Sequence, residues 1–169
     1  YKTRLQVGHN ILIYFPLVIP DILMGISLLL FFVSLKIQLG LITIFLAHST
    51  FCISYVAMVV LGRFQDFDYT IIEAALDLGA TWSAAVRKIL IPFLAPGIAA
   101  GGLLAFTLSL DDFVITFFVS GPSSTTLPVY IYSMMRHGSP SVINALSVIM
   151  IAFTFIIIFF TKKLLEVKK

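Results

Sequence analysis

Long apolar stretches separated by short polar segments dominate this chain. Four of them, residues 11–35, 41–61, 93–120 and 141–161, reach the roughly 20 residues that a helix needs to cross a hydrocarbon core. Only helices and closed barrels satisfy the backbone in lipid, and the short alternating segments of barrel strands are missing from the sequence. We therefore predict an all-α fold, a polytopic transmembrane helix bundle with about four spans.

The composition agrees with a chain that lies in the lipid bilayer. Only 11% of the residues are charged, against roughly a quarter in a soluble domain, and the mean hydropathy is +1.08. The net charge of +3 follows from the basic flanks of the spans. It gives no reason to expect a nucleic-acid partner.

The positions of the basic residues predict the orientation. Cytoplasmic flanks of membrane proteins are enriched in Lys and Arg. With the chain start and the C-terminus in the cytoplasm, only Lys36 and Arg136 of the eleven basic residues lie outside. The nine inside are Lys2, Arg4, Arg63, Arg87, Lys88, Lys162, Lys163, Lys168 and Lys169.

Several absences from the sequence narrow the function. The chain begins with Tyr1, lacks a signal-peptide pattern, and starts with a basic flank of the kind that follows an earlier span, so we expect the later part of a longer protein. The single Cys52 excludes an internal disulfide framework. Without a Gly-x4-Gly-Lys-Ser/Thr phosphate loop, the chain is not expected to hold ATP itself, and the sequence indicates no other cofactor and no metal site.

The polar segment 63–92 interrupts the apolar pattern and predicts two short helices on the cytoplasmic face. Thr70 and Glu73 have the spacing of a capping box, which starts a helix at about Ile71. Gly79 ends that helix, because glycine adopts the left-handed conformation without steric cost.

A second short helix is expected from Trp82 to Leu90. Thr81 or Ser83 would cap its start. Its end is expected before Pro92, because the residue preceding a proline is disfavoured in the helical region.

Two helices this short are marginal alone, so they need something to pack against. Ala74, Ala75 and Gly79 are small enough for another protein to approach closely, and Glu73 and Asp77 form one acidic stripe. The alternative is a pair of loop helices packed on their own bundle. DNA binding by this helix-turn-helix is disfavoured, since the first helix is acidic and lies at the membrane.

The stretch "EAALDLGATWSAAVRKILIP", residues 73–92, resembles the EAA signature of ABC importer permeases, EAA-x3-G-x9-I-x-L-P. The one departure is Ile91, an apolar replacement for the usual leucine. The segments "IQLG", "LSLDDFVITFFVSGPS", "LPVYIYSM" and "SPSVINALS" look like those of spermidine/putrescine permeases of the PotC type, so the resemblance covers nearly the whole chain.

The resemblance implies a bacterial inner-membrane transport subunit that is not itself an enzyme. Its partners would be cytoplasmic ATPase subunits, a second permease subunit and a periplasmic or external substrate-binding protein. Such permeases usually have about six spans, so about two would precede this chain. The EAA loop would dock on the ATPase and couple ATP binding to movement of the spans, through Glu73, Ala74, Ala75, Asp77, Gly79, Ile89 and Pro92. A permease for another small solute or ion is the alternative to a polyamine permease.

The third span carries two adjacent acids, Asp111 and Asp112. At about 100° per residue, they flank the small-residue stripe of Gly97, Gly101 and Ala105 and are expected to face the bundle. Paired carboxylates at the membrane are costly and suit a polycationic substrate. Alternatively, both acids are solvated at the membrane edge, or they pair with Lys36 or Arg136.

Asp21 and His48 are further candidates for the substrate pathway. Asp21 follows Pro20 within the first span, where it either caps a helix restarted after the proline or points into the pathway. His48 in the second span either lines the pathway or pairs with a neighbouring helix.

A membrane-embedded enzyme built on His48 with Asp111 or Asp112 is the rival class. Neither Gly-x-Ser-x-Gly nor HExxH supports it, and no catalytic residue is assigned. After the turn-rich segment 121–128, residues 129–137 predict a short external helix that would offer a face to an external binding protein.

Overall fold

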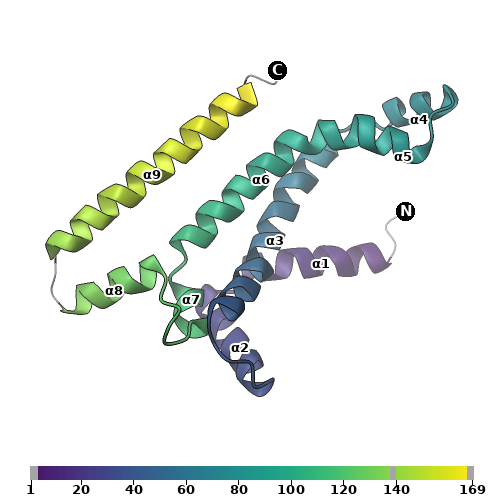
Figure 1. Cartoon of the computed structure of the whole chain (residues 1–169). Helices are drawn as coiled ribbons and strands as arrows, with labels where there is room; N and C mark the ends of the chain where they lie inside the picture. The colour runs from purple at the N-terminus through teal and green to yellow at the C-terminus, as the bar shows by residue number, and fades with distance from the viewer. Residues whose placement is uncertain (1–3, 138–139, 167–169) are drawn as a thin grey trace.

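A computed structural model describes residues 4–137 and 140–166, and every regular element in these two ranges is a helix (Figure 1). The all-α prediction is therefore confirmed. The elements are α1 (Arg4–Val18), α2 (Asp21–Ser34), α3 (Leu41–Gln65), α4 (Thr70–Asp77), α5 (Trp82–Ala85), the π-helical turn η1 (Val86–Leu90), α6 (Ile91–Asp111), α7 (Val114–Val119), α8 (Leu127–His137) and α9 (Pro140–Glu166).

The predicted first span at residues 11–35 is not one straight helix. α1 and α2 meet at an angle of 111°. Pro20 lies in the break with φ −58° and ψ 135°. Its carbonyl accepts hydrogen bonds from the amides of Leu23 and Met24 in the first turn of α2. Because proline lacks an N–H and disfavours the helical region for the residue before it, the first helix ends there and a new one starts. Within the described residues, three helices are long and apolar enough to span a membrane, or four if this bent pair counts as one.

The second span is confirmed as α3, which packs antiparallel against α6. The predicted stripe of small residues lies at this contact: a Cβ added to Gly101 would lie 3.3 Å from the Cα of Val56. The Cys52 thiol, nearer the start of α3, lies 3.5 Å from the Ala105 carbonyl oxygen. The two backbones therefore approach closely along the stripe, as small residues in membrane helices permit.

The third span begins earlier than predicted, because one helix runs without a break for 30 residues from Trp82 to Asp111. The expected end before Pro92 is wrong. The turn Val86–Leu90 is π-helical, and the Ile91 amide donates to the Val86 carbonyl five residues back. This wider turn accommodates the proline at the second position of α6, where a regular α-helical turn would collide with the ring.

The same span also ends earlier than predicted. Asp112 is extended, with φ −63° and ψ 117°, and the separate short helix α7 follows. α7 packs across α2, where an added Cβ on Gly25 would lie 3.4 Å from the Cα of Ile115. A continuous helix over residues 93–120 is therefore wrong.

The buried core lies where α2, α3 and α7 meet. Its members are apolar residues from those three helices: Met24, Phe32, Ile44, Ala47, Phe51, Ile115 and Val119. This packing holds α7 in place beyond the end of α6. It thereby fixes the position of the acids at that end.

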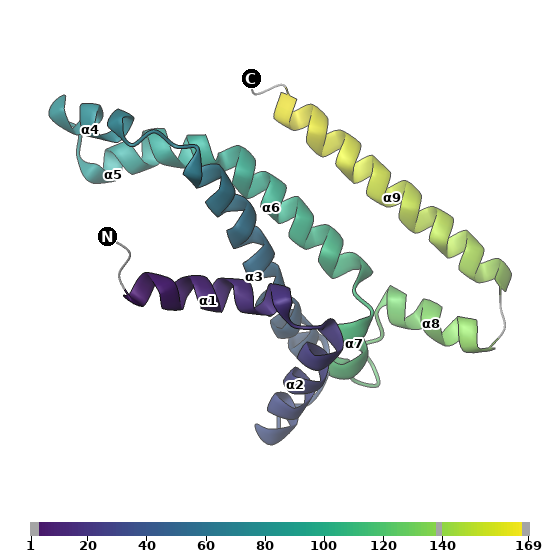
Figure 2. The same cartoon turned by 180° about the vertical axis from the view of Figure 1, so that it is seen from behind.

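The last two elements agree with the sequence. α8 contains the helix predicted at 129–137, and α9 contains the fourth span, with its apolar part at Ser141–Phe159. α9 contacts α8 and touches α6, but both views show it at the edge of the molecule (Figures 1 and 2), and no residue from 141 to 159 is buried. The C-terminal end of α9 and the α4–α5 end of the long helix lie on the same side of the molecule, whereas α7 and α8 lie on the other.

Candidate functional site

The first helix of the polar segment 63–92, called the EAA segment below, starts as predicted but is capped differently. α4 begins at Thr70, yet no capping box forms, because the Glu73 amide donates to the Tyr69 carbonyl oxygen at 3.2 Å. Instead, Asp68 Oδ1 accepts the Thr70 amide at 2.9 Å. That hydrogen bond lowers the pKa of the exposed Asp68 carboxyl. An acid two residues before the helix start was the signal that the sequence analysis missed.

The turn after α4 has the predicted geometry. Gly79 has φ +87°, its amide donates to Leu76 O at 2.9 Å, and the Ala80 amide donates to Ala75 O at 3.0 Å. These two bonds together form a Schellman motif. Thr81, not Ser83, then caps the next helix by accepting the Ala84 amide at 3.3 Å.

One side of the EAA segment packs on its own chain. Ile72 of α4 is buried with Phe67 and Ala85, and Ala75 and Ile89 pack around them. Phe67 also meets the Phe93 ring with centroids 5.0 Å apart, which ties the segment to the start of α6.

The other side of the segment is open. Glu73, Ala74, Asp77, Gly79 and Pro92 are exposed. Two large apolar side chains beside them are exposed as well, Leu78 at 89% and Trp82 at 62%. The predicted self-packing therefore describes only one face, and a surface with acidic, small and apolar groups remains uncovered.

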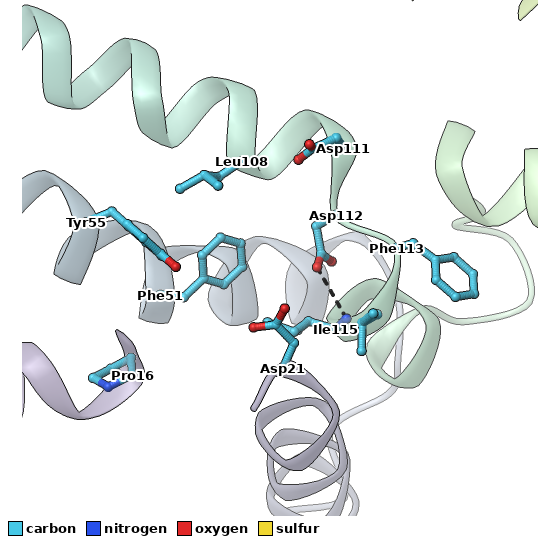
Figure 3. A pocket seen from close by; sticks show the side chains of 10 residues that line it. Pro16, Asp21, Phe51, Tyr55, Leu108, Asp111, Asp112, Phe113 and Ile115 are labelled. Atoms are coloured by element: carbon cyan, nitrogen blue, oxygen red, sulfur yellow. Dashed lines mark hydrogen bonds between the residues drawn. The ribbon is translucent and has the colours of Figure 1, made fainter. Parts of the chain in front are cut away.

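A cavity of about 330 Å³ lies at the opposite end of the long helix, among α1, α2, α3 and the α6–α7 junction (Figure 3). Three of its lining groups are acids, and most of the others are apolar or aromatic. The lining residues are Pro16, Asp21, Phe51, Tyr55, Leu108, Asp111, Asp112, Phe113, Val114 and Ile115.

Asp21 and Asp111 approach the cavity from opposite sides, Asp21 from α2 and Asp111 from the end of α6 (Figure 3). Both are exposed. Across the described residues, neither carboxylate accepts a hydrogen bond from another residue, and neither forms an ion pair, with Lys36 and Arg136 included. Asp21 makes no capping bond at the start of α2. Both acids are therefore available to a cation in the cavity.

Asp112 is held differently from its neighbour. Its Oδ2 accepts the Thr116 amide at 2.8 Å and the Thr116 hydroxyl at 2.7 Å, and Oδ1 accepts the Ile115 amide at 3.3 Å. Both amides lie in the first turn of α7, so Asp112 ends α6 and its carboxylate caps α7. The expected helical geometry around Gly97 extends only as far as Asp111.

His48 is buried behind Asp112 and does not line the cavity. Its Nε2 lies 3.3 Å from Asp112 Oδ2 and 2.8 Å from Thr116 Oγ1. Its Nδ1 lies 2.7 Å from Ser109 Oγ. Of the two roles considered for His48, the geometry therefore agrees with pairing to neighbouring helices.

The aromatic lining was missed in the sequence analysis. Phe51 and Tyr55 follow His48 by three and seven residues, so the three lie on one face of α3. That periodicity was the available signal. Phe113 had no such signal, because it follows the break that the sequence did not predict. No group of three His, Cys, Asp or Glu side chains in the described residues could hold a metal ion.

Comparison with known proteins assigns the chain to a family. Residues 1–166 match the family described as binding-protein-dependent transport system inner membrane component. The chain belongs to this family. Members of the family similar to this chain include the putrescine transport system permease protein PotI of Escherichia coli (strain K12), 47% identical over 156 residues that cover 89% of this chain and 56% of the relative.

Two further relatives carry the name spermidine/putrescine transport system permease protein PotC. The Escherichia coli (strain K12) protein is 40% identical over 158 residues, 94% of this chain and 60% of the relative. The Haemophilus influenzae protein is 41% identical over 151 residues, 89% of this chain and 59% of the relative. The chain thus spans 56–60% of the length of these family members.

Proposed function

We propose that this chain is part of a membrane-spanning permease subunit of an ATP-driven ABC importer that carries polyamines, putrescine or spermidine, into the cytoplasm. The observation that carries the proposal is the cavity lined by Asp21, Asp111 and Asp112 at one end of a helix whose other end joins the EAA segment. The names of the relatives, which specify putrescine and spermidine transport, support this choice of substrate.

The cavity has the chemistry that a flexible polycation needs. Two exposed carboxylates on opposite sides provide separate anchors for separate ammonium groups. The aromatic rings of Phe51, Tyr55 and Phe113 can contact the methylene chain and add cation–π attraction. Ionisable groups at a membrane span usually face a bundle interior or an aqueous pathway, which agrees with a place on the transport route.

The EAA segment is the docking surface for a cytoplasmic ATPase subunit in this proposal. Its exposed side, with Glu73, Ala74, Asp77 and Gly79, would contact the ATPase, while the buried side anchors it through Ile72. Because α5, η1 and α6 form one helix, displacement of the docked segment would move the cavity end of the same helix. Rigid-body movement of this kind produces alternating access in transporters.

The remaining parts of the proposal concern partners and orientation. A second permease subunit would complete the pathway, and a periplasmic or external binding protein would deliver the substrate. The EAA segment, the chain start and the C-terminus would be cytoplasmic in a bacterial inner membrane. The arrangement of the C-terminal end of α9 on the same side as α4 and α5 supports this orientation.

The test is uptake of radiolabelled putrescine and spermidine by cells that carry the full-length gene with its partner genes and lack other polyamine importers. We expect saturable uptake that unlabelled polyamine competes away. The matched control is the same operon with an ATPase subunit unable to hydrolyse ATP. If the cells take up neither polyamine but do take up a different solute or ion, the assignment of the substrate is wrong and the transport function stands.

A further inference from the structure

His48 is a buried polar residue at the meeting point of three helices. It belongs to α3, its Nδ1 contacts Ser109 of α6, and its Nε2 contacts Thr116 of α7. Its side chain and that of Asp112 are each 10% exposed. A buried polar group in such a place requires partners, and His48 has one for each ring nitrogen.

The hydrogen bonds also fix which atom of His48 donates. The single hydroxyl hydrogen of Thr116 goes to Asp112 Oδ2. Thr116 Oγ1 can then only accept, so the bond from His48 Nε2 at 2.8 Å requires a hydrogen on that nitrogen. The same N–H points toward Asp112 Oδ2 at 3.3 Å.

The network controls one wall of the cavity. Asp112 is the point where α6 ends and α7 begins, and Phe113, Val114 and Ile115 directly after it line the cavity. His48 holds Asp112 and Thr116 to α3, while its other nitrogen holds the end of α6 through Ser109. The apolar core and the bond from Thr43 Oγ1 to Val119 O hold α7 on α3 further along, whereas His48 holds the break itself, next to the wall that faces Phe51 and Tyr55.

We propose that His48 is a positioning residue for the cation cavity: it fixes Asp112 and the α6–α7 break against α3 without touching the substrate. The substrate part of this inference rests on the proposed function. The positional part does not, because it concerns the shape of the chain alone.

The first test is a double-mutant cycle on uptake. His48→Leu removes both ring contacts, whereas His48→Gln keeps an N–H donor at similar reach. We expect the half-saturating putrescine concentration to rise about tenfold in His48→Leu, the size of effect that loss of a hydrogen bond to a charged group produces, and to recover largely in His48→Gln. Thr50→Val is the control, since within the part of the chain that the structure describes the Thr50 hydroxyl donates to Leu46 O in its own helix and to no other helix.

The cycle is completed with Asp112→Asn. If His48 acts largely through Asp112, His48→Leu should change uptake much less in the Asp112→Asn background than in the wild type, because coupled residues are not additive. Additive losses would overturn the proposal, since His48 would then act independently of Asp112. Normal uptake by Asp112→Asn would overturn it as well.

The second test needs no transport. In the complete detergent-purified complex with Cys52→Ala, a cysteine is introduced by Phe113→Cys, and its labelling rate with a water-soluble thiol reagent is measured. We expect His48→Leu to raise the rate about tenfold as the wall loosens, and His48→Gln and Thr50→Val to leave it near the parent rate. An unchanged or lower rate in His48→Leu would overturn the positioning role. If the wild-type complex takes up no polyamine while the cysteine variants show this labelling pattern, only the proposed substrate is overturned.

Discussion

Trp82 and Asp111 are the two ends of one helix of 30 residues. One end follows the turn that joins it to α4, and the other carries an acid of the cavity. At 1.5 Å per residue these ends are about 44 Å apart. One unbroken helix therefore connects the exposed face of α4 with the acidic cavity.

The orientation can be tested with topology reporters. We expect a reporter fused after Lys169 to read cytoplasmic and one inserted at Ser123, in the segment between α7 and α8, to read external. The measurement is the activity of a reporter that functions on only one side of the membrane. The reverse pattern would place the EAA segment outside and remove its proposed contact with an ATPase.

In the proposed function, docking of the EAA segment depends on the left-handed turn at Gly79. A β-branched residue at φ +87° is strained, so Gly79→Val should destabilise the turn by roughly 1–2 kcal/mol or more and displace α4. We expect the protein to insert into the membrane but to lose co-purification with the ATPase subunit. Gly79→Ala should show a weaker form of the same defect.

The matched control for this variant is Gly62→Ala. Gly62 lies within α3 without a positive φ, and an added Cβ there meets nothing within 4 Å. A cysteine introduced by Ala74→Cys, on the exposed face of α4, should also crosslink to the ATPase subunit. Undiminished ATP-driven uptake by Gly79→Val would count against the docking role.

The cavity acids are expected to differ in what they contribute. Asp21→Asn and Asp111→Asn remove charge from side chains without partners in the described structure, so the half-saturating polyamine concentration should rise about tenfold each, with assembly unchanged. The double change Asp111→Asn with Asp112→Asn should reduce uptake further. Complex assembly and the basal ATPase rate are measured alongside, and wild-type uptake by the double variant would show that the acids are not the substrate site.

The contact between α3 and α6 makes a prediction about stability. Gly101→Val would place side-chain atoms against the Val56 backbone, where even a Cβ lies at 3.3 Å, and should destabilise the protein by about 1–3 kcal/mol. Thermal unfolding in detergent, followed by helix content, is the measurement. Gly102→Val is the control, because a Cβ there meets nothing within 4 Å; equal losses in both variants would mean that the packing contact is not the cause.

The sequence predicted those helices and turns that are determined by neighbouring residues in the chain. Apolar length was enough for α3 and α9, and glycine at residue 79 was enough for the turn after α4. The two helix breaks, between α1 and α2 and between α6 and α7, were not predicted from hydropathy. The bend between α1 and α2 lies within an unbroken apolar stretch, so hydropathy does not register it, although Pro20 marked the position.

The end of α6 illustrates what a one-dimensional pattern cannot contain. Nothing in the residues around Asp112 forbids a helix. The Asp112 carboxylate accepts hydrogen bonds from the amides of Ile115 and Thr116. The Thr116 hydroxyl also forms a hydrogen bond with His48, which lies on another helix and 68 residues away in sequence. A tertiary contact therefore supports the local cap at the break, and the pattern of residues around Asp112 does not contain that contact.

The π-helical turn at Val86–Leu90 contains one residue more than an α-helical turn, and each residue of an α-helix turns the chain by about 100°. Because the ring of Pro92 needs the wider turn, deleting one residue from it would restore the collision with the preceding carbonyl. Inserting or deleting one residue in the regular part of α6 would instead rotate α4 relative to the cavity by about 100°. The number of residues in α6 therefore sets the direction that the exposed face of α4 takes relative to the acids of the cavity.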